Sequence, residues 1–297
     1  MLTTEQLKTM FSQMAAFGIQ RIGIWGGEPL LRADILEVLS FARNLGMYVT
    51  IDTNGYLVPQ KPDIVNCVDH IIVSLDGPQQ SHDANREPGS FEKAMAAVEL
   101  ISRSKTPLWT ITVLTKNNLD KIDWILDKAD EYNFTPTFQV LHHSSCFGVN
   151  DPLMPSDDEY RQCLLHLKEA KGKGRRMGNS MSCIEHLLNW KSFFENTSEN
   201  PGAGWNRCWA GKFYVNVDAD GRLFPCSLLI DDEKDAPSVV KLGFDKAWQT
   251  MASEALPCQS CSATCFTEYN LLFSLNHRTI LQWVMAMGSR LRPAKQN

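Results

Sequence analysis

Five of the nine cysteines lie in the C-terminal third of the chain, at spacings that suit a shared metal site. The first two cysteines are separated by twelve residues, then Gly221, then four further residues. The last three are separated from one another by two and by three residues. The five are Cys208, Cys226, Cys258, Cys261 and Cys265. Four thiolates around one centre bind either a zinc ion or an iron–sulfur cluster, so one of the five is spare.

The segment between the first two cysteines has the pattern of a β-hairpin. Residues 213–218 and 222–224 are predicted to be short strands on either side of a turn at Asp220-Gly221. Such a turn would bring Cys208 and Cys226 together. Disulfides are the alternative, but they need an oxidising compartment, and the N-terminus has no signal-peptide pattern. Metal binding in the cytoplasm is therefore predicted.

The other four cysteines stand alone in the sequence. Each is expected to be an isolated core thiol, because free cysteine is often buried. They are Cys67, Cys146, Cys163 and Cys183.

The composition indicates a globular protein with a sizeable core. The chain has 297 residues, of which 43% are hydrophobic, and a formal net charge of -5. This length favours one large domain with an appendage. The negative charge argues against nucleic acid as the main partner, and no apolar run approaches the length of a membrane span.

The first half of the chain alternates between strand and helix patterns. A capping box at Thr3 and Gln6 begins a helix that Gly18 ends, and five strands are predicted to start near residues 19, 47, 70, 108 and 135. Helical segments separate these strands. Repeated β/α units of this kind predict a parallel sheet or barrel of the α/β class.

Polar residues and glycines gather where these strands end. In parallel β/α folds, functional groups lie at the C-terminal ends of the strands. Adjacent glycines allow backbone amides to approach a ligand closely, and Asp76 is a candidate acceptor for ribose hydroxyls. Each residue is also an ordinary turn former, so the signal lies in their joint placement. The residues are Gly26, Gly27, Glu28, Thr53, Asn54, Ser74, Asp76 and Gln139.

The second half of the chain loses this alternation. A capping box at Ser156 and Glu159 begins a helix to Lys171, and further helices are predicted for residues 182–194 and 271–290. We therefore expect three domains: a partial barrel at 1–145, a helical connector at 146–206, and a cysteine-rich domain with a C-terminal helix at 207–297.

In this order the motifs resemble those of the radical S-adenosylmethionine enzymes that carry a C-terminal SPASM or twitch extension. Gly26-Gly27-Glu28-Pro29 is similar to the family's GGEP motif, which holds the methionine amino group of S-adenosylmethionine. Thr53-Asn54 and Ser74 with Asp76 resemble the ribose-side strand ends. Asp83 with Arg86 resembles a loop whose arginine meets the cofactor's carboxylate. The expected cofactor-binding residues are Gly26, Gly27, Glu28, Pro29, Thr53, Asn54, Ser74, Asp76, Arg86 and Gln139.

The resemblance implies an incomplete parallel (β/α) radical SAM barrel, strands two to six, with an auxiliary 4Fe-4S cluster. The cluster ligands would be Cys208, Cys226, Cys258 and either Cys261 or Cys265. The implied reaction is reductive cleavage of S-adenosylmethionine to a 5'-deoxyadenosyl radical, which abstracts hydrogen from a peptide or small-molecule substrate. The electron donor would be a flavodoxin or ferredoxin. The auxiliary cluster would accept an electron or ligate the substrate, and the sequence leaves both open.

One departure from the family pattern concerns the catalytic cluster. Family members bind it through Cys-x3-Cys-x2-Cys after the first strand, whereas here no cysteine precedes Cys67. The run Cys258-x2-Cys261-x3-Cys265 has the reverse order. We therefore expect a truncated N-terminus and a chain that is inert by itself. The alternatives are a natural loss of chemistry, leaving a non-catalytic metal-binding scaffold or partner subunit, and a zinc tetrathiolate at the C-terminal site.

Overall fold

A computed structural model describes residues 1–142, 151–200, 207–230 and 235–288. Cys146 lies outside these residues. Five parallel strands form the main sheet in the order in which they occur along the chain, with β1 and β5 at its edges. The strands are β1 Arg21–Ile24, β2 Tyr48–Thr53, β3 His70–Ser74, β4 Leu108–Leu114 and β5 Thr135–Val140. The five strands predicted from the sequence are confirmed.

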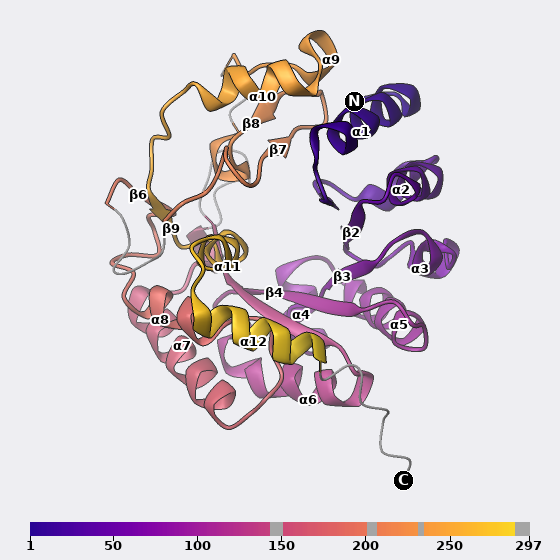
Figure 1. The fold of residues 1–297 in the computed structure, drawn as a ribbon. Helices are drawn as coiled ribbons and strands as arrows, with labels where there is room; N and C mark the ends of the chain where they lie inside the picture. The colour runs from indigo at the N-terminus through magenta and orange to yellow at the C-terminus, as the bar shows by residue number, and fades with distance from the viewer. Residues whose placement is uncertain (143–150, 201–206, 231–234, 289–297) are drawn as a thin grey trace.

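The first six helices pack along the convex side of the curved sheet (Figure 1). Alternate strand residues face them; in β4, for example, Leu108 and Leu114 are buried on that side. The predicted capping box at Thr3 is present, and Gly18 ends α1 in the left-handed conformation, with φ 102°. The helices are α1 Thr4–Phe17, α2 Ile35–Asn44, α3 Ile64–Cys67, α4 Gln79–Asn85, α5 Ser90–Ser102 and α6 Ile122–Tyr132.

Short 3-10 turns lie in the connections between these elements. Three of them, η1, η2 and η4, contain a proline in their first two positions, which is compatible with its fixed φ. The turns are η1 Pro29–Leu31, η2 Val58–Gln60, η3 Leu119–Lys121, η4 Asp151–Leu153 and η5 Ser227–Leu229.

The helical connector differs from its prediction in one boundary. The capping box of Ser156 and Glu159 begins α7 Asp157–Gly172 as predicted. Helix α8 spans Met181–Leu188 and ends six residues before the predicted end at Phe194. The chain leaves the helix because Phe193, which is buried, donates its backbone N–H to the Asp157 carboxylate, 2.8 Å away.

The predicted C-terminal helix is two helices. Helix α11 spans Thr264–Phe273 and α12 spans His277–Gly288. Leu275 between them has a positive φ of 57°, and the Asn276 side chain accepts the Thr279 N–H at 3.0 Å. Asparagine at this position caps a new helix, so the apolar pattern of residues 271–290 does not mark one continuous helix.

The cysteine-rich region is built from very short strands and two helices. The predicted hairpin is present as β7 Asn216–Val217 paired with β8 Leu223–Phe224, and β6 Thr197–Ser198 pairs with β9 Ser260–Cys261. Helices α9 Val239–Leu242 and α10 Phe244–Ala252 follow the hairpin.

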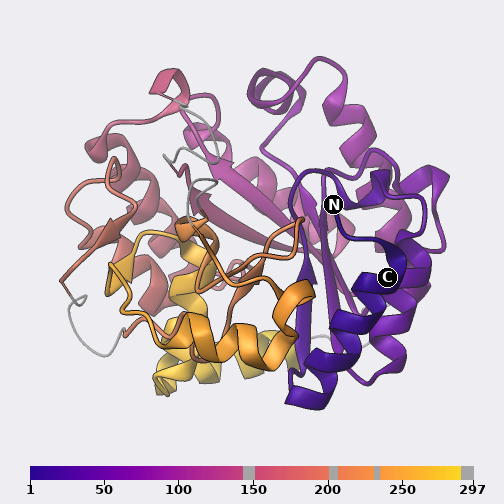
Figure 2. The same cartoon turned by 90° about the horizontal axis from the view of Figure 1, so that it is seen from above.

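This region closes a ring with the start of the chain (Figures 1 and 2). The Phe17 ring of α1 lies 5.3 Å from the Phe244 ring and 5.2 Å from the Trp248 ring of α10, measured between centroids. The Leu2 N–H donates to the Ala219 carbonyl at 3.0 Å. Helix α1 therefore joins the sheet to the cysteine-rich region.

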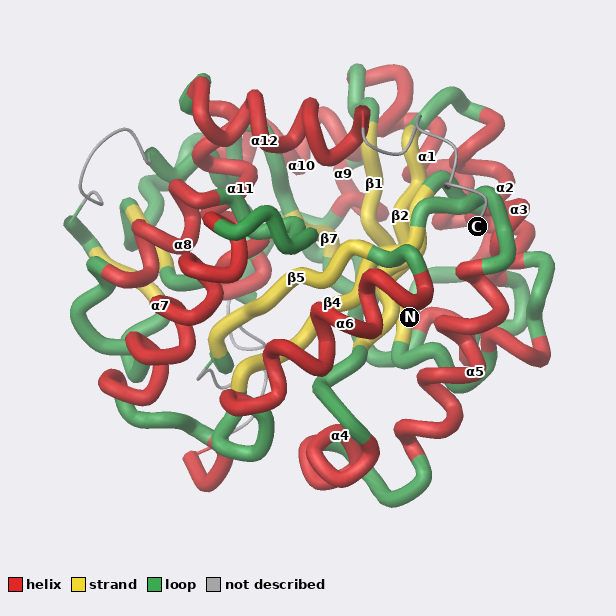
Figure 3. The backbone as a smooth tube through the Cα atoms, turned by 90° about the horizontal axis from the view of Figure 1, so that it is seen from below, coloured by secondary structure: helices red, strands yellow, loops and turns green. Residues whose placement is uncertain are grey.

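Helices α11 and α12 lie on the side of the sheet opposite α6 (Figure 3). The Trp109 ring of β4 packs on Trp283 of α12 at a centroid distance of 5.8 Å. The Arg21 side chain of β1 packs on Tyr269 of α11 at 5.8 Å. The C-terminal helices thus cover part of the concave face of the sheet. No helix in the described part of the chain combines the length and apolar character that a membrane span requires.

We expect Gly178→Ala to lower the melting temperature. The Gly178 N–H donates to Pro136 of the edge strand β5 at 2.8 Å. A Cβ at this position would lie 2.6 Å from Thr137 Cγ2 and 2.8 Å from Trp109 Cζ3. Overpacking of this kind costs about 1–3 kcal/mol. Thermal unfolding followed by circular dichroism measures the change.

The matched control is Gly172→Ala in α7, where a Cβ would meet no atom within 4 Å. Alanine has the higher helix propensity, so this variant should melt at the same or a slightly higher temperature. Equal melting temperatures for Gly178→Ala and the wild type would contradict the close packing at this position.

Candidate functional site

The Glu28 carboxylate ties the loop after β1 to the end of β2. It accepts hydrogen bonds from Leu30 N at 3.0 Å, Thr53 Oγ1 at 2.7 Å and Asn54 N at 2.8 Å. A carboxylate has about four acceptor positions, so one is left for a further donor. The predicted site residues at the ends of β1 and β2 are therefore brought together.

The backbone of Gly26 and Gly27 borders open space beside this carboxylate. Both glycines are exposed, and Gly26 has a φ of 111°, which favours glycine. A Cβ at Gly27 would meet no atom within 4 Å. Pro29 then begins η1. The loop thus leaves room for a ligand to contact backbone amides.

Asp76 at the end of β3 is buried and positions Arg86. Its carboxylate accepts from Arg86 Nε at 2.7 Å and from Val113 N at 3.0 Å. Asn118 Nδ2 donates to the Asp76 carbonyl at 2.9 Å, and the Asp76 N–H donates to His82 Nδ1 at 3.1 Å. Both carboxylate oxygens are already engaged. The interaction of Asp76 with a ribose remains a prediction, and the observed geometry gives it a supporting role.

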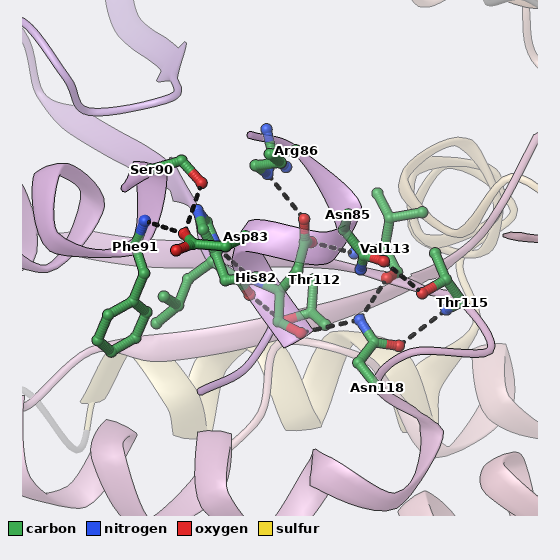
Figure 4. Close-up of polar contacts among 12 residues, drawn as sticks. His82, Asp83, Asn85, Arg86, Ser90, Phe91, Thr112, Val113, Thr115 and Asn118 are labelled. Carbon is green, nitrogen blue, oxygen red and sulfur yellow. Dashed lines mark hydrogen bonds and ion pairs between the residues drawn. The ribbon is translucent and has the colours of Figure 1, made fainter. Parts of the chain in front are cut away.

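Arg86 projects away from this network (Figure 4). Only its Nε is hydrogen-bonded to a described residue, which leaves the two terminal nitrogens as donors. Its side chain is 25% exposed. Arg86 is therefore placed to bind an anionic group next to the strand ends.

The loop that carries Arg86 is held by Asp83. The Asp83 carboxylate accepts from Phe91 N at 2.8 Å, Gly89 N at 3.0 Å and Ser90 Oγ at 3.0 Å. These hydrogen bonds, led by those from the backbone of Phe91 and Gly89, lower the pKa of Asp83. The contacts connect α4 to the start of α5 and fix the loop between them.

Ser74 and Gln139 lie on the concave side of the sheet. Both are half-buried, and neither side chain is hydrogen-bonded to a described residue. They belong to different strands, β3 and β5. The structure therefore places them on the same face as the other candidates without joining them directly.

Four of the five clustered cysteines line one small cavity of about 10 Å³. They are Cys208, Cys226, Cys258 and Cys261. Burial raises the pKa of Cys258 to about 11, and the neighbouring Cys208 contributes in the same direction. Burial likewise raises the pKa of Cys226 and Cys261, with contributions from nearby thiols. A metal centre would stabilise the thiolate forms, so this donor set fits a cluster or metal ion.

Cys265 does not line this cavity. It lies in the first turn of α11, is exposed, and interacts electrostatically with Asp52 of β2. Although the residue is exposed, desolvation of its thiol raises its pKa to about 12, and the nearby Asp52 contributes in the same direction. Of the two alternative fourth ligands, Cys261 lines the cavity and Cys265 does not. Three of the cysteines expected to be isolated are described: Cys163 and Cys183 are buried, and Cys67 is half-buried. Cys183 interacts electrostatically with Cys261 and Cys265, so it is not isolated from the other thiols.

Several residues that support the cavity were missed by the sequence analysis. Asn270 Oδ1 accepts from Trp209 N at 2.9 Å and from Tyr214 Oη at 3.1 Å. Tyr214 Oη lies 3.8 Å from Cys208 Sγ, and His186 Nε2 lies 2.9 Å from the Cys261 carbonyl oxygen. These contacts join distant segments, so no local pattern indicates them.

The four thiols share a cavity, and the kind of metal centre they could hold is a separate question. Within the described residues, no three His, Cys, Asp or Glu side chains are arranged to hold one metal ion. A zinc tetrathiolate requires sulfurs about 2.3 Å from a common centre. The zinc tetrathiolate and the iron–sulfur cluster therefore both remain predictions for these cysteines.

Comparisons with known proteins match both halves of the chain. Residues 1–129 match the family model described as the radical SAM superfamily. The mycofactocin maturase MftC of Mycolicibacterium smegmatis is 30% identical over 258 residues, which are 84% of this chain and 62% of that protein. The AdoMet-dependent heme synthase of Methanosarcina barkeri is 28% identical over 77% of this chain and 68% of its own length. The chain thus spans less than two thirds of the MftC relative.

Solved structures share the fold. The structure of anSMEcpe with bound AdoMet and a Cp18Cys peptide superposes with a TM-score of 0.63 and 16% identity, covering 97% of this chain and 92% of that one. Streptococcus suis SuiB bound to the precursor peptide SuiA superposes with a TM-score of 0.64 and 14% identity, covering 86% and 61%. At these identities the likeness supports the fold: a parallel sheet with a cysteine-rich C-terminal region.

Asp83→Asn should reduce stability more at neutral pH than in acid. The pKa of Asp83 is lowered in the folded protein, so its stabilising effect is present above the ordinary carboxyl pKa of 3.8 and is lost as the pH falls through the lowered value. Melting temperatures between pH 7 and pH 2.5 should therefore converge for variant and wild type in acid. Asp158→Asn, at a side chain 94% exposed, is the surface control. If the melting temperatures of Asp83→Asn and the wild type differed by the same amount from pH 7 to pH 2.5, the stabilising role of the ionised Asp83 carboxylate would be contradicted.

Proposed function

Because this chain is a member of the radical SAM enzyme family, we propose that it belongs to an enzyme that cleaves S-adenosylmethionine reductively and modifies a peptide or small molecule. The observation that carries the proposal is that Gly26, Gly27 and Glu28 after β1 and Arg86, held by Asp76 after β3, follow the C-terminal ends of strands in one parallel sheet. Backbone amides, a carboxylate and a guanidinium together complement the amino and carboxylate groups of an amino acid.

The residues fit S-adenosylmethionine as follows. The free acceptor position of Glu28 and the backbone beside Gly27 would hold the methionine amino group, and Arg86 would hold the carboxylate. Asp76 would keep Arg86 in place. When it is bound at a reduced catalytic cluster, S-adenosylmethionine supplies a 5'-deoxyadenosyl radical that abstracts hydrogen from the substrate. On this reading the five strands are strands two to six of a (β/α) barrel.

Cys208, Cys226, Cys258 and Cys261 would hold an auxiliary 4Fe-4S cluster. Their common cavity supports this set, and the place of Cys265 outside the cavity favours Cys261 as the fourth ligand. Full ligation by cysteine suits an auxiliary cluster that accepts an electron from the substrate radical. A flavodoxin or ferredoxin would be the external electron donor of the enzyme. The proposed domains are then the barrel at 1–145, the helical connector at 146–206 and the cluster domain at 207–297.

A peptide is one candidate substrate class. MftC is named a maturase, and the superposed structures of SuiB and anSMEcpe contain peptides. The heme synthase relative makes a small-molecule substrate the alternative.

A second candidate function is a non-catalytic metal-binding scaffold or partner subunit. Its support is the cavity lined by four cysteines, which would hold metal whether or not the sheet takes part in radical chemistry. The genomic sequence immediately upstream of Met1 discriminates the two. An in-frame Cys-x3-Cys-x2-Cys segment favours the enzyme, and a stop codon or an unrelated sequence favours the scaffold.

Gly27→Val should weaken binding of S-adenosylmethionine at least tenfold without loss of stability. The added side chain enters open space in the free protein and would block the approach of a ligand to the backbone. Equilibrium dialysis with radiolabelled S-adenosylmethionine measures the dissociation constant. Gly172→Ala in α7 is the control and should bind as the wild type does. Unchanged binding by Gly27→Val would contradict the proposed cofactor position.

Cys208→Ala and Cys226→Ala should abolish most iron loading after anaerobic reconstitution. The wild-type chain should hold about four irons and four sulfides in this site. Cys265→Ala and Cys67→Ala are matched controls and should retain the full content, because neither thiol lines the cavity. Iron and acid-labile sulfide analysis provides the measurement. Zinc without sulfide in the anaerobic protein, or full loading of Cys226→Ala, would contradict the assignment.

A further inference from the structure

The guanidinium of Arg21 points along the concave face of the sheet. Its Nη2 donates to Thr50 Oγ1 of the neighbouring strand at 3.3 Å. In the β1–β2 pairing, Arg21 stands opposite Tyr48, so the side chain reaches two residues further along β2. The guanidinium is thereby directed toward the strand ends, along the concave side of the sheet.

Two tyrosine rings hold this guanidinium. Its Cζ lies 5.3 Å from the Tyr48 ring centroid and 5.8 Å from that of Tyr269 on α11. Contacts of a guanidinium with aromatic rings orient it and leave its N–H groups directed sideways. The position of the charge is thus set by β1, β2 and α11 together.

Arg21 has no ion pair with any residue that the structure describes, and it is exposed. Two other arginines of the strand-end loops do form ion pairs: Arg32 with Asp34 at 2.6 Å and Arg86 with Asp76 at 2.7 Å. Four of the five N–H groups of Arg21 have no hydrogen-bond partner among described residues. An oriented, exposed cation with unused donors is suited to binding an anion.

Asp52 supplies a second unused polar group. It lies on the same face of β2 as Thr50, two residues further on, and its Oδ1 is shielded from solvent without a hydrogen-bond partner. Burial raises the pKa of Asp52 to about 7, against the effect of Arg21. A buried polar atom without a partner is uncommon in native proteins. The protonated form can donate a hydrogen bond to an anion bound at Arg21.

This cation is distinct from the one assigned to the cofactor. Arg21 precedes Gly26 by five residues, so its Cα lies about 17 Å from the glycine loop along an extended strand. Arg86 stands at the opposite, C-terminal end of the strands. Helix α11, which carries Tyr269, also carries the exposed Cys265 beside the cysteine cavity. The Arg21 group thus lies on the concave face near the start of β1, where Tyr269 of α11 contacts it.

We propose that Arg21, held between Tyr48 and Tyr269 with Asp52 beside it, binds a carboxylate group of the substrate. This proposal rests on the proposed function and specifies its substrate class as molecules that present a carboxylate to the concave face. The planar fork of a guanidinium matches two coplanar oxygens, which favours a carboxylate. A peptide C-terminus and an acidic side chain share this chemistry.

Three small probes test the proposal by isothermal titration calorimetry on the full chain. N-acetylphenylalanine presents an α-carboxylate, N-acetylphenylalaninamide presents none, and N-acetylglutamic acid α-amide presents only a side-chain carboxylate. We expect wild-type protein to bind at least one of the two acids about tenfold more tightly than the neutral amide. Preference for the first acid identifies a peptide C-terminus, and preference for the other identifies an acidic side chain.

Arg21→Gln should reduce this preference to less than twofold, and Arg21→Lys should retain part of it, because lysine keeps the charge without the fork. Arg103→Gln is the matched control: Arg103 pairs with Glu99 on the exposed surface of α5, and its loss should leave the preference unchanged. Equal binding of acids and amide by the wild type, or no binding of any probe, would overturn the proposal. So would a preference that persists in Arg21→Gln.

These measurements are made without reductant or S-adenosylmethionine. Their outcome therefore does not depend on radical chemistry, and a failure of the proposed function would appear separately in the cofactor-binding experiment with Gly27→Val. Melting temperatures of both Arg21 variants show whether each is folded. If Arg21→Gln is unfolded, the lysine variant decides, because retention of the full tenfold preference without the fork would contradict bidentate recognition.

Discussion

The parallel pairing of five strands places all of their C-terminal ends at one edge of a curved sheet. This constraint brings residues that are distant in the sequence into one site. Glu28 follows β1, and Thr53 and Asn54 end β2, yet their atoms lie within 3 Å of each other. The same edge receives Asp76 from β3 and, through it, Arg86. A different strand order would separate these groups, whatever their local conformation.

Carboxylates organise the loops at this edge. Glu28, Asp76 and Asp83 each accept hydrogen bonds from backbone N–H groups of another element or loop. Such charge-assisted bonds hold loop backbone that cannot pair within a strand or helix. Their consequence for binding is indirect: Asp76 and Asp83 fix the position of Arg86 and leave its terminal nitrogens for a ligand. Structural and ligand-binding roles are therefore divided between neighbouring residues.

The cysteine-rich region depends on the same sheet from its other side. Packing of Phe17 on Phe244 and Trp248 joins α1 to α10, while Trp283 and Tyr269 contact the concave face. These apolar and aromatic contacts set where the four cavity cysteines lie relative to the strands. They also turn Cys265 and Tyr269 toward β1 and β2, which is why the concave face carries groups from both halves of the chain.

Local sequence patterns were sufficient for the five strands, for the capping boxes at Thr3 and Ser156, and for the hairpin after Cys208, because each depends on neighbouring residues. The cysteine spacing likewise indicated a shared site. The sequence did not reveal the end of α8, the break at Leu275, the pairing of Asp76 with Arg86, or the surroundings of Arg21. Each of these depends on contacts between distant segments: Phe193 with Asp157, Asp76 with Val113, and Arg21 with Tyr269. The position of Cys261 in the cavity wall and of Cys265 outside it is of the same kind, since only packing decides which of two nearby cysteines lines the cavity.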